Sequence, residues 1–385
     1  MKLPKFIAVK VSSPLIPFRI LLSILMVLEF MFIGTALADD GSEVATATPV
    51  ASPTPAHTGL TFSGFADTYY AHDFDDPDVH ERPYTTLPLR NDEPRLNLGY
   101  ADAKLDTEDW HGRLALQYGD SVIANYASEK YEFWRYFQEA YAGYKVNDNL
   151  WIDGGIFFSH LGVESFISRD NYTYTRSLVA DYSPYYESGL RATYTLSEEW
   201  SAELLLLHGW QNITQDENPA LGMQINYTPT TTTQLTYANY LGDLAGFRNF
   251  HDFYGKYDLT EKLSLAAEFD VGNQNLTHDG GNVWWNGWTF FARYKFTPKL
   301  SLGARVERYA DPHQVVLQTL SGESYEAVGL SANIDYELYK GLVWRTEFRS
   351  FSATHDVFPR EEHFSSGDNL ILTSLAYSFD LGGLN

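Results

Sequence analysis

The sequence contains no cysteine among its 385 residues, and it has only 27 basic side chains against 50 acidic ones. Without cysteine, disulfide scaffolds, iron–sulfur clusters and thiolate zinc sites are excluded. The formal net charge of −23 argues against a nucleic-acid-binding protein, because the phosphate backbone requires a basic surface. Beyond the N-terminal region no apolar run approaches roughly 18 residues, which excludes a helical membrane protein.

Aromatic side chains are the abundant class. Phenylalanine, tyrosine and tryptophan occur 24, 27 and 9 times and make up 16% of the chain. This share is high for a soluble domain, so the environment of the folded chain has to account for it.

The N-terminus has the pattern of a secretory signal peptide over residues 1–38. Basic residues precede an apolar run over 20–33, which is followed by the small-residue cleavage motif Ala-Leu-Ala at 36–38. The apolar run is too short for a spanning helix, which needs roughly 20 residues. Residues 39–59 are rich in alanine, threonine and proline and predict a disordered periplasmic linker. Residues 60–385 contain no second linker and no change of composition, so they predict a single domain.

A tyrosine-containing unit recurs along this domain. Examples are Tyr144-Lys-Val-Asn, Tyr257-Asp-Leu-Thr and Tyr294-Lys-Phe-Thr, each followed by polar residues and a new apolar run. The tyrosine and the apolar residue two positions later share one face of a strand. Each unit therefore marks the end of a strand, a tight turn and the start of the next strand. The irregular spacing of the units excludes a fixed-period solenoid or propeller.

The alternating runs predict sixteen strands, with short and long connections in strict alternation and both termini at the short-turn end. The region 197–207 also resembles the start of a helix, but its turn fits the repeat, so we assign it to a strand. The expected strands are 60–71, 95–105, 110–118, 136–146, 150–160, 186–196, 200–210, 219–228, 232–241, 250–259, 263–273, 285–296, 300–309, 325–338, 342–351 and 369–379. The expected long connections are 72–94, 119–135, 161–185, 211–218, 242–249, 274–284, 310–324 and 352–368.

This organisation is typical of an all-β, transmembrane, antiparallel up-and-down β-barrel with short periplasmic turns and long extracellular loops. The expected strand 342–351 shows the reason. One face carries Trp344 and Phe348, and the other carries Arg345, Glu347 and Arg349. Burying the charged face in a packed core would cost several kcal/mol per unpaired charge. A closed barrel in a bilayer gives one face lipid and the other water, and leaves no open edge.

The aromatic residues fit the same interpretation. The repeated tyrosines lie just before the short turns, and Trp110, Trp151, Trp200 and Trp344 lie near the same turns. Together they predict an aromatic girdle at one membrane interface. A soluble β-sandwich or propeller is the alternative, but it does not explain the two-sided alternation.

Several segments resemble the β-barrel porin-2 (OmpL-like β-barrel) family of outer-membrane porins. They are residues 138–144, 154–165, 171–177, 186–194, 303–311 and 344–349, and the resemblance covers essentially all of 60–380. The resemblance implies a channel-like barrel in the bacterial outer membrane, in contact with lipid and lipopolysaccharide and inserted by the barrel assembly machinery. One departure is the C-terminus, where Phe379 is followed by six more residues instead of ending the chain.

Sixteen strands enclose an aqueous channel, whereas eight would be filled by side chains. Charged residues on the inward face are therefore candidates for lining the pore, and the arginines of the late strands are candidates for a basic wall that sets ion preference. The alternative is that they are ordinary charges of a wetted lumen, and the sign of any selectivity stays open. The pore-lining candidates are Arg113, Arg191, Arg293, Arg305, Glu307, Asp335, Arg345, Glu347 and Arg349.

The long connection 161–185 is a candidate for folding into the barrel and narrowing it. Its charged candidates for the constriction are Glu164, Arg169, Asp170, Arg176 and Asp181. An ordinary surface loop is an equal alternative. In the connection 72–94, Asp73, Asp75, Asp76 and Asp78 are spaced loosely like a calcium loop but lack its glycine, so we expect no metal site there.

No H-E-x-x-H or G-x-S-x-G motif is present, and Ser159 and His160 lie on opposite faces of one expected strand. We therefore expect an outer-membrane porin that passes small hydrophilic solutes or ions without enzymatic chemistry, metal or cofactor. A homotrimer is compatible with this function. The alternatives are a non-conducting barrel that serves as an adhesin or structural protein, and a lipid hydrolase with its site near His160 or His208.

Overall fold

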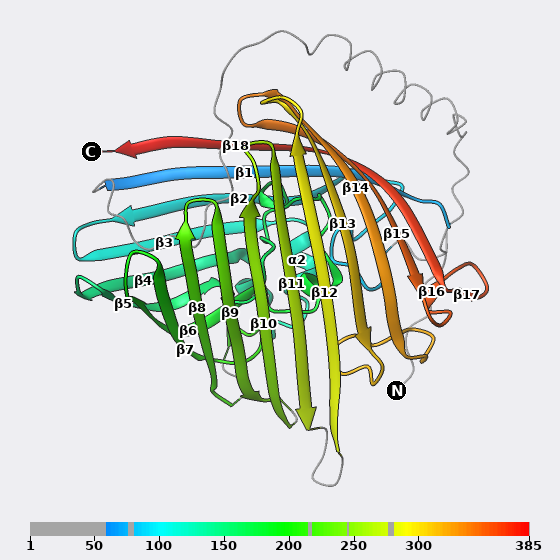
Figure 1. Cartoon of the computed structure of the whole chain (residues 1–385), viewed down its shortest axis with the longest axis horizontal. Helices are drawn as coiled ribbons and strands as arrows, with labels where there is room; N and C mark the ends of the chain where they lie inside the picture. Colours follow the sequence, from blue (N-terminus) through cyan, green and yellow to red (C-terminus); the bar gives the residue numbers. More distant parts are fainter. Residues whose placement is uncertain (1–58, 76–80, 215–217, 245, 276–280, 385) are drawn as a thin grey trace. The chain divides into compact units, whose positions relative to one another are not determined.

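The computed structural model describes residues 59–75, 81–214, 218–244, 246–275 and 281–384. The expected signal peptide and all of the expected linker except Gly59 lie outside these residues. Within them, sixteen antiparallel strands form a closed barrel in which β1 pairs with β18, as Figure 1 shows in blue and red. Among the described residues, no helix is both long and apolar enough to cross a membrane.

The barrel strands run in chain order around the wall. They are β1 (Gly59–Asp73), β2 (Arg95–Asp106), β3 (Trp110–Tyr118), β4 (Phe137–Asn147), β5 (Leu150–Phe158), β6 (Tyr186–Thr195), β7 (Trp200–Leu207), β8 (Ala220–Thr230), β9 (Thr233–Asp243), β10 (Phe247–Asp258), β11 (Leu263–Asn275), β12 (Asn282–Lys295), β13 (Leu300–Asp311), β14 (Tyr325–Tyr339), β15 (Leu342–Ala353) and β18 (Gly367–Leu384). The connections contain α2 (Asp120–Asn125), η1 (Glu132–Tyr136), η2 (Ser168–Asp170), α3 (Leu178–Asp181) and a small sheet of β16 (Phe358–Pro359) and β17 (Phe364–Ser365).

The predicted barrel, its sixteen strands and the short turns are confirmed, and the region after Ser197 is strand β7 rather than a helix. Two of the expected long connections are wrong. The connection 242–249 is a tight hairpin, because the ladder continues to the pair Asp243 and Phe247. The connection 274–284 shrinks because β11 and β12 extend until Asn275 pairs with Asn282. Polar side chains at the water-exposed rim do not prevent backbone pairing, so the strands continue beyond the apolar band.

The two faces of the sheet alternate as the sequence indicates. On β15, Arg345, Glu347 and Arg349 point inward and are 1%, 0% and 0% exposed, whereas the outward Phe348 is 45% exposed. The inward side chains are therefore not bathed in open water, because other parts of the chain cover them inside the barrel.

Aromatic pairs mark the short-turn end of the outer surface. Trp110 packs on Tyr144 across β3 and β4 with ring centroids 4.8 Å apart, and Trp200 packs on Tyr227 across β7 and β8 at 4.3 Å. All four belong to the expected girdle region. Trp151 does not, because its position on β5 turns it inward, where it stacks on His111. Its assignment to the girdle is corrected, since the neighbouring Leu150 takes the outward position.

The alternation gives a test of which face meets lipid. Leu330 and Leu338 both point outward on β14, but Leu330 lies near the middle of the strand and Leu338 near its short turn. We expect Leu330→Arg to lower the free energy of unfolding by about 2–4 kcal/mol and Leu338→Arg by about 0–1 kcal/mol, because the cost of a lipid-facing charge depends on depth. Denaturant titration of barrels refolded in phospholipid vesicles measures both. Equal losses for the two variants would contradict the assignment of this face to lipid.

Candidate functional site

Residues 159–185, which connect β5 to β6, form a loop inside the barrel, here called the inserted loop. Its hydrogen bonds reach inward-facing side chains of β10, β11, β13, β15 and β1. Because β15, β18 and β1 are neighbours in the closed sheet, these strands form one continuous arc of the wall. The loop therefore contacts the wall along that arc.

The inserted loop begins at a buried histidine ion pair. Nδ1 of His160 lies 2.9 Å from a carboxylate oxygen of Glu187, and Nε2 lies 2.7 Å from the backbone carbonyl oxygen of Asn239. Both partners are acceptors, so both ring nitrogens carry a proton and His160 is an imidazolium. Burial opposes this charged form, but Glu187 and the carbonyl outweigh it and raise the pKa of His160.

The middle of the loop is held by charges of the late strands. Arg305 on β13 donates to the hydroxyl of Thr173 at 2.8 Å and to the carbonyl of Thr175 at 2.5 Å. Glu347 on β15 accepts the backbone N–H and the hydroxyl of Thr175, each at 2.7 Å. Glu307 accepts the N–H of Leu178 at 2.6 Å, at the start of α3. These wall charges are satisfied by loop backbone and hydroxyls, which is what a buried charge requires.

The loop also crosses to the first strand. The hydroxyls of Ser168 and Tyr174 donate to the Asp67 carboxylate on β1 at 2.6 and 3.0 Å. On the neighbouring wall, Arg345 donates to the backbone carbonyls of Ser168 and Asn171. The turn of η2 is thus held from two sides.

A glycine of the wall makes room for this seating. A Cβ on Gly303 of β13 would lie 2.1 Å from the carbonyl oxygen of Tyr172, far inside van der Waals contact. The loop backbone therefore lies directly against the wall at this position, and only glycine permits that approach.

The tip of the loop faces the remaining interior space. Arg169 and Tyr172 are partly exposed and Asp170 is exposed. Although solvent reaches Asp170, the surrounding barrel encloses it, and this enclosure raises its pKa against the opposing effect of nearby cations, including Arg169, Lys256 and Arg293. Among the described residues, Arg169 and Lys256 form no ion pair. The tip therefore presents charges of both signs to any solute in the interior.

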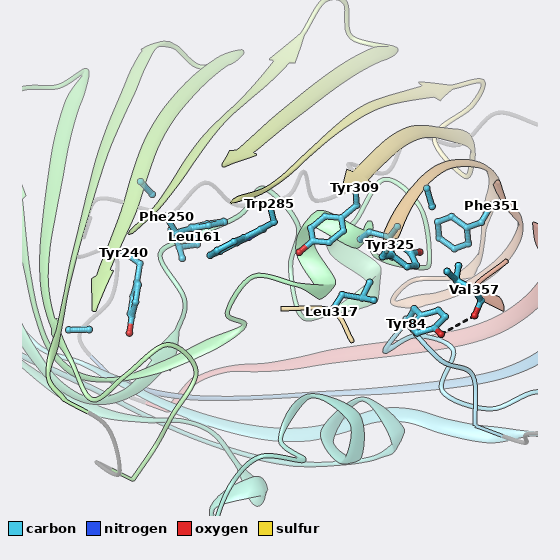
Figure 2. Close-up of a cluster of buried hydrophobic side chains, with 14 of the residues drawn as sticks. Tyr84, Leu161, Tyr240, Phe250, Trp285, Tyr309, Leu317, Tyr325, Phe351 and Val357 are labelled. Atoms are coloured by element: carbon cyan, nitrogen blue, oxygen red, sulfur yellow. Dashed lines mark hydrogen bonds between the residues drawn. The ribbon is translucent and has the colours of Figure 1, made fainter. Parts of the chain in front are cut away.

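Aromatic side chains fill the interior near the long-loop ends of the late strands, as Figure 2 shows. Tyr240, Phe250, Trp285 and Tyr325 of the wall belong to this buried cluster. Tyr84, from the connection between β1 and β2, joins it, and its hydroxyl donates to the carbonyl of Val357 at 2.9 Å. Loops other than the inserted loop thus also occupy the interior.

The sequence candidates fall into two groups in the structure. Arg113, Arg191 and Arg293 point inward with side chains 22%, 18% and 20% exposed, so they meet the interior space. A second group is buried under other parts of the chain or within the inserted loop, which departs from the expectation that these residues line open water. These buried candidates are Arg305, Glu307, Asp335, Arg345, Glu347 and Arg349 of the wall, and Glu164, Arg176 and Asp181 of the loop.

Arg176 shows the physical reason why these candidate residues are buried. Its guanidinium lies over the rings of Tyr185 and Phe166, with 4.2 and 5.2 Å to their centroids, and beside the Asp181 carboxylate at 3.4 Å. The Arg176 side chain therefore packs within the inserted loop and stabilises it, and does not project from the surface of the loop. Sequence reasoning missed Asp67 as a loop anchor, although its inward position in the alternation of β1 was a signal.

The hydrolase alternative directs attention to His208, whose Nδ1 lies 2.9 Å from the hydroxyl of Ser188. The same Nδ1 lies 3.0 Å from the carbonyl of Ile213, and the Ser188 hydroxyl also bonds the carbonyls of Asn212 and Ile213. An Nδ1 that donates to a carbonyl carries the proton and is no base for the serine. This arrangement anchors the connection after β7.

Comparisons with known proteins place this barrel in context. A family model described as "Putative beta-barrel porin-2, OmpL-like" matches residues 59–379. A search of curated proteins finds no match to the sequence. Among solved structures, the outer membrane channel DcaP of Acinetobacter baumannii is similar, with a TM-score of 0.58 at 13% identity over 83% of this chain and 97% of that chain.

Two further structures are similar at comparable levels. An anion-selective porin from Comamonas acidovorans gives a TM-score of 0.57 at 9% identity, covering 83% of this chain and 99% of that chain. The in-vitro folded OmpT of Vibrio cholerae, described as a trimer form, gives 0.53 at 10% identity, covering 83% and 99%. At these identities the similarities establish the fold alone.

Gly303 gives a test of how the inserted loop is seated. We expect Gly303→Ala to displace the loop from the wall at a cost of about 1–3 kcal/mol, because the added methyl overlaps the backbone at Tyr172. Limited trypsin digestion followed by mass spectrometry then detects faster cleavage after Arg169 and Arg176. Gly99→Ala is the control, since its Cβ meets nothing closer than 3.8 Å. Unchanged cleavage in Gly303→Ala would show that the loop is not seated there.

The pH dependence of stability gives a test of the His160 ion pair at the start of the inserted loop. The pKa of His160 is raised above the ordinary 6.5 in the folded protein, so the stabilisation by its ion pair with Glu187 is complete below pH 6.5. That stabilisation is lost as the pH rises through the folded pKa. We expect the difference in unfolding free energy between the wild type and His160→Gln to shrink over that range, as measured by denaturant titration at a series of pH values. A difference independent of pH would contradict the charged state of His160.

Proposed function

The chain belongs to the beta-barrel porin-2, OmpL-like family of outer-membrane barrels, and we propose that it is a passive diffusion channel for small hydrophilic solutes or ions. In this proposal the inserted loop narrows the interior, and discrimination comes from the bore and from the charges around the loop tip. No enzymatic step and no cofactor is part of the proposal.

The observation that carries the proposal is a set of charged side chains that keep contact with solvent inside the barrel. Arg113 of β3, Arg191 of β6 and Arg293 of β12 point inward and are 22%, 18% and 20% exposed, although the inserted loop contacts strands from β10 to β1. Arg113 is paired with Asp102, and Arg191 with Asp153, so the interior offers charges of both signs along the wall. Such a surface suits water and polar solutes and disfavours apolar ones.

Ion preference is proposed to depend on the unpaired charges near the loop tip. Arg169 and Lys256 are cationic without an ion pair among the described residues, and Asp170 opposes them. Neutralised pairs such as Arg191 with Asp153 contribute little net field at a distance. The balance among these three side chains therefore sets the sign of the selectivity.

The proposed assembly is a homotrimer in the outer membrane, in contact with lipid and lipopolysaccharide and inserted by the barrel assembly machinery. Support for the trimer comes from the fold, because the similar OmpT of Vibrio cholerae is described in a trimer form.

A second candidate function is a barrel that does not conduct. The observation in its favour is the buried aromatic cluster, which occupies the interior near the long-loop ends together with Tyr84. A barrel of this kind would serve in adhesion or structure. Conductance separates the two candidates directly.

We expect the refolded wild type to give stable conductance steps in a planar bilayer with a KCl gradient, and a reversal potential that depends on the loop tip. Lys256→Gln should shift the reversal potential toward cation preference and Asp170→Asn toward anion preference. A unit charge about 4 Å from an ion in water contributes about 1 kcal/mol, which equals about a fivefold change in local ion concentration.

The matched control is Lys299→Gln, a change of the same type in the exposed short turn between β12 and β13. It should leave the reversal potential unchanged. Insertion without any conductance would reject the channel and favour the non-conducting barrel. Conductance with identical reversal potentials in all variants would reject the role of the loop tip.

A further inference from the structure

Three carboxylates of the barrel wall converge behind the start of the inserted loop. Asp252 on β10 lies directly opposite Asp270 on β11, and Glu268 is the next inward residue of β11. One oxygen of each carboxylate lies within 4.8 Å of the other two. The three residues are 0%, 5% and 0% exposed in the order Asp252, Asp270 and Glu268, so water does not screen their mutual repulsion.

Backbone amides of the inserted loop satisfy only part of this group. The N–H of Gly162 donates to Oδ2 of Asp252 at 2.6 Å, and the N–H of Val163 donates to Oε2 of Glu268 at 3.2 Å. The second oxygens, Oδ1 of Asp252, Oε1 of Glu268 and Oδ1 of Asp270, are buried without a hydrogen-bond partner among the described residues. Among the residues that the structure describes, no lysine, arginine or histidine forms an ion pair with any of these three carboxylates.

A second acidic triad in the same barrel has arginine partners, which the first triad lacks among the described residues. Asp73, Asp75 and Asp368 are equally close to one another. Arg82 pairs with Asp73 and, at 2.6 Å, with Asp368, while Arg360 pairs with Asp75 at 3.1 Å. Two guanidinium groups of the protein therefore balance two of the three carboxylates in this triad. The triad behind the inserted loop has no such partner among the described residues.

An independent feature of the wall points to the same position. Tyr309 on β13 is 1% exposed, and its hydroxyl has no hydrogen-bond partner among the described residues. Tyr309 lies opposite Gly287 of β12, which lies opposite Asp270. The ring covers Gly287, with Cδ2 3.0 Å from where a Cβ would be, so it extends over the strand that separates Tyr309 from Asp270. Figure 2 shows the hydroxyl on the side of the ring that faces Trp285.

We propose that Asp252, Glu268 and Asp270 bind a hard divalent cation of the calcium class, with the Tyr309 hydroxyl as a further oxygen ligand or as the partner of a bound water. Carboxylate oxygens are the ligands that such cations prefer, and their flexible geometry tolerates a site built from two strands. The cation supplies the positive charge that arginines supply in the other triad. This site does not depend on the channel function.

The consequence for the inserted loop follows from the shared carboxylates. Asp252 and Glu268 use one oxygen to hold the backbone at Gly162 and Val163 and leave the other for the cation. A bound cation therefore fixes the two carboxylates that anchor the start of the loop. Without it, the carboxylates repel one another, because Asp252 lies directly opposite Asp270 and both are buried from water.

The test uses the full-length protein, refolded in detergent free of lipopolysaccharide and stripped with EDTA. Terbium, which binds calcium sites, is added while tryptophan is excited. The indole of Trp285 covers Gly272, two residues from Asp270, and therefore serves as an antenna for a bound terbium ion. We expect saturable luminescence with one terbium per chain, and its displacement by calcium.

Glu268→Gln with Asp270→Asn should weaken terbium binding at least about tenfold, because two anionic ligands are lost. Asp75→Asn in the arginine-paired triad is the control and should leave binding unchanged. Luminescence that does not saturate, or that survives in the double variant, would overturn the proposal and leave the triad held by protons.

The wild type alone provides a second measurement, which does not require the variants to fold. We expect the midpoint of thermal unfolding to rise with calcium concentration and to fall in EDTA, because a ligand that binds only the folded state stabilises it by mass action. A midpoint that is the same in calcium and in EDTA would also overturn the proposal.

Discussion

Backbone hydrogen bonding in hydrocarbon is the constraint on which this structure depends. Lipid offers no partner for a free N–H or C=O group, so a sheet that crosses a bilayer has to satisfy its own edges. Here the long pairing of β1 with β18 closes the last edge. Once the sheet is closed, the two-residue period of every strand sends one side chain to the outside and the next to the inside. The division between apolar and charged residues that runs through the sequence is a direct consequence of that closure.

Closure creates a second requirement inside the barrel. Inward charges such as Arg305 and Glu347 are stable in water, but the inserted loop removes water from them. The loop compensates with its own backbone groups and hydroxyls, as Thr175 does for both residues at once. Wall and loop are therefore interdependent, because neither the buried charges nor the loop backbone is satisfied without the other. The proposed cation extends the same principle to carboxylates for which the described chain provides no counter-charge.

The sequence was sufficient for the features that depend on local periodicity. Strand positions, short turns and the inward direction of Arg345 follow from alternation and turn chemistry. It was insufficient wherever a long-range contact decides. The hairpin at Asp243 and Phe247 depends on continued pairing at the rim, and the inward turn of Trp151 depends on which of two adjacent apolar residues faces lipid. The burial of Arg345 beneath Ser168 depends on a loop more than 170 positions away in the sequence, and no local pattern encodes that distance.

These differences change which charges are candidates for acting on a solute. The late-strand arginines appear in the sequence as a basic wall, yet Arg305 and Arg345 are bound to carboxylates and to the inserted loop, and Arg349 is bound to Glu307. The interior space is bordered instead by Arg113 and Arg191 of the early strands, by Arg293 of β12 and by the tip of the loop. In the proposed channel, discrimination between solutes therefore depends on these solvent-exposed charges, while the buried charges Arg305 and Arg345 hold the inserted loop in position.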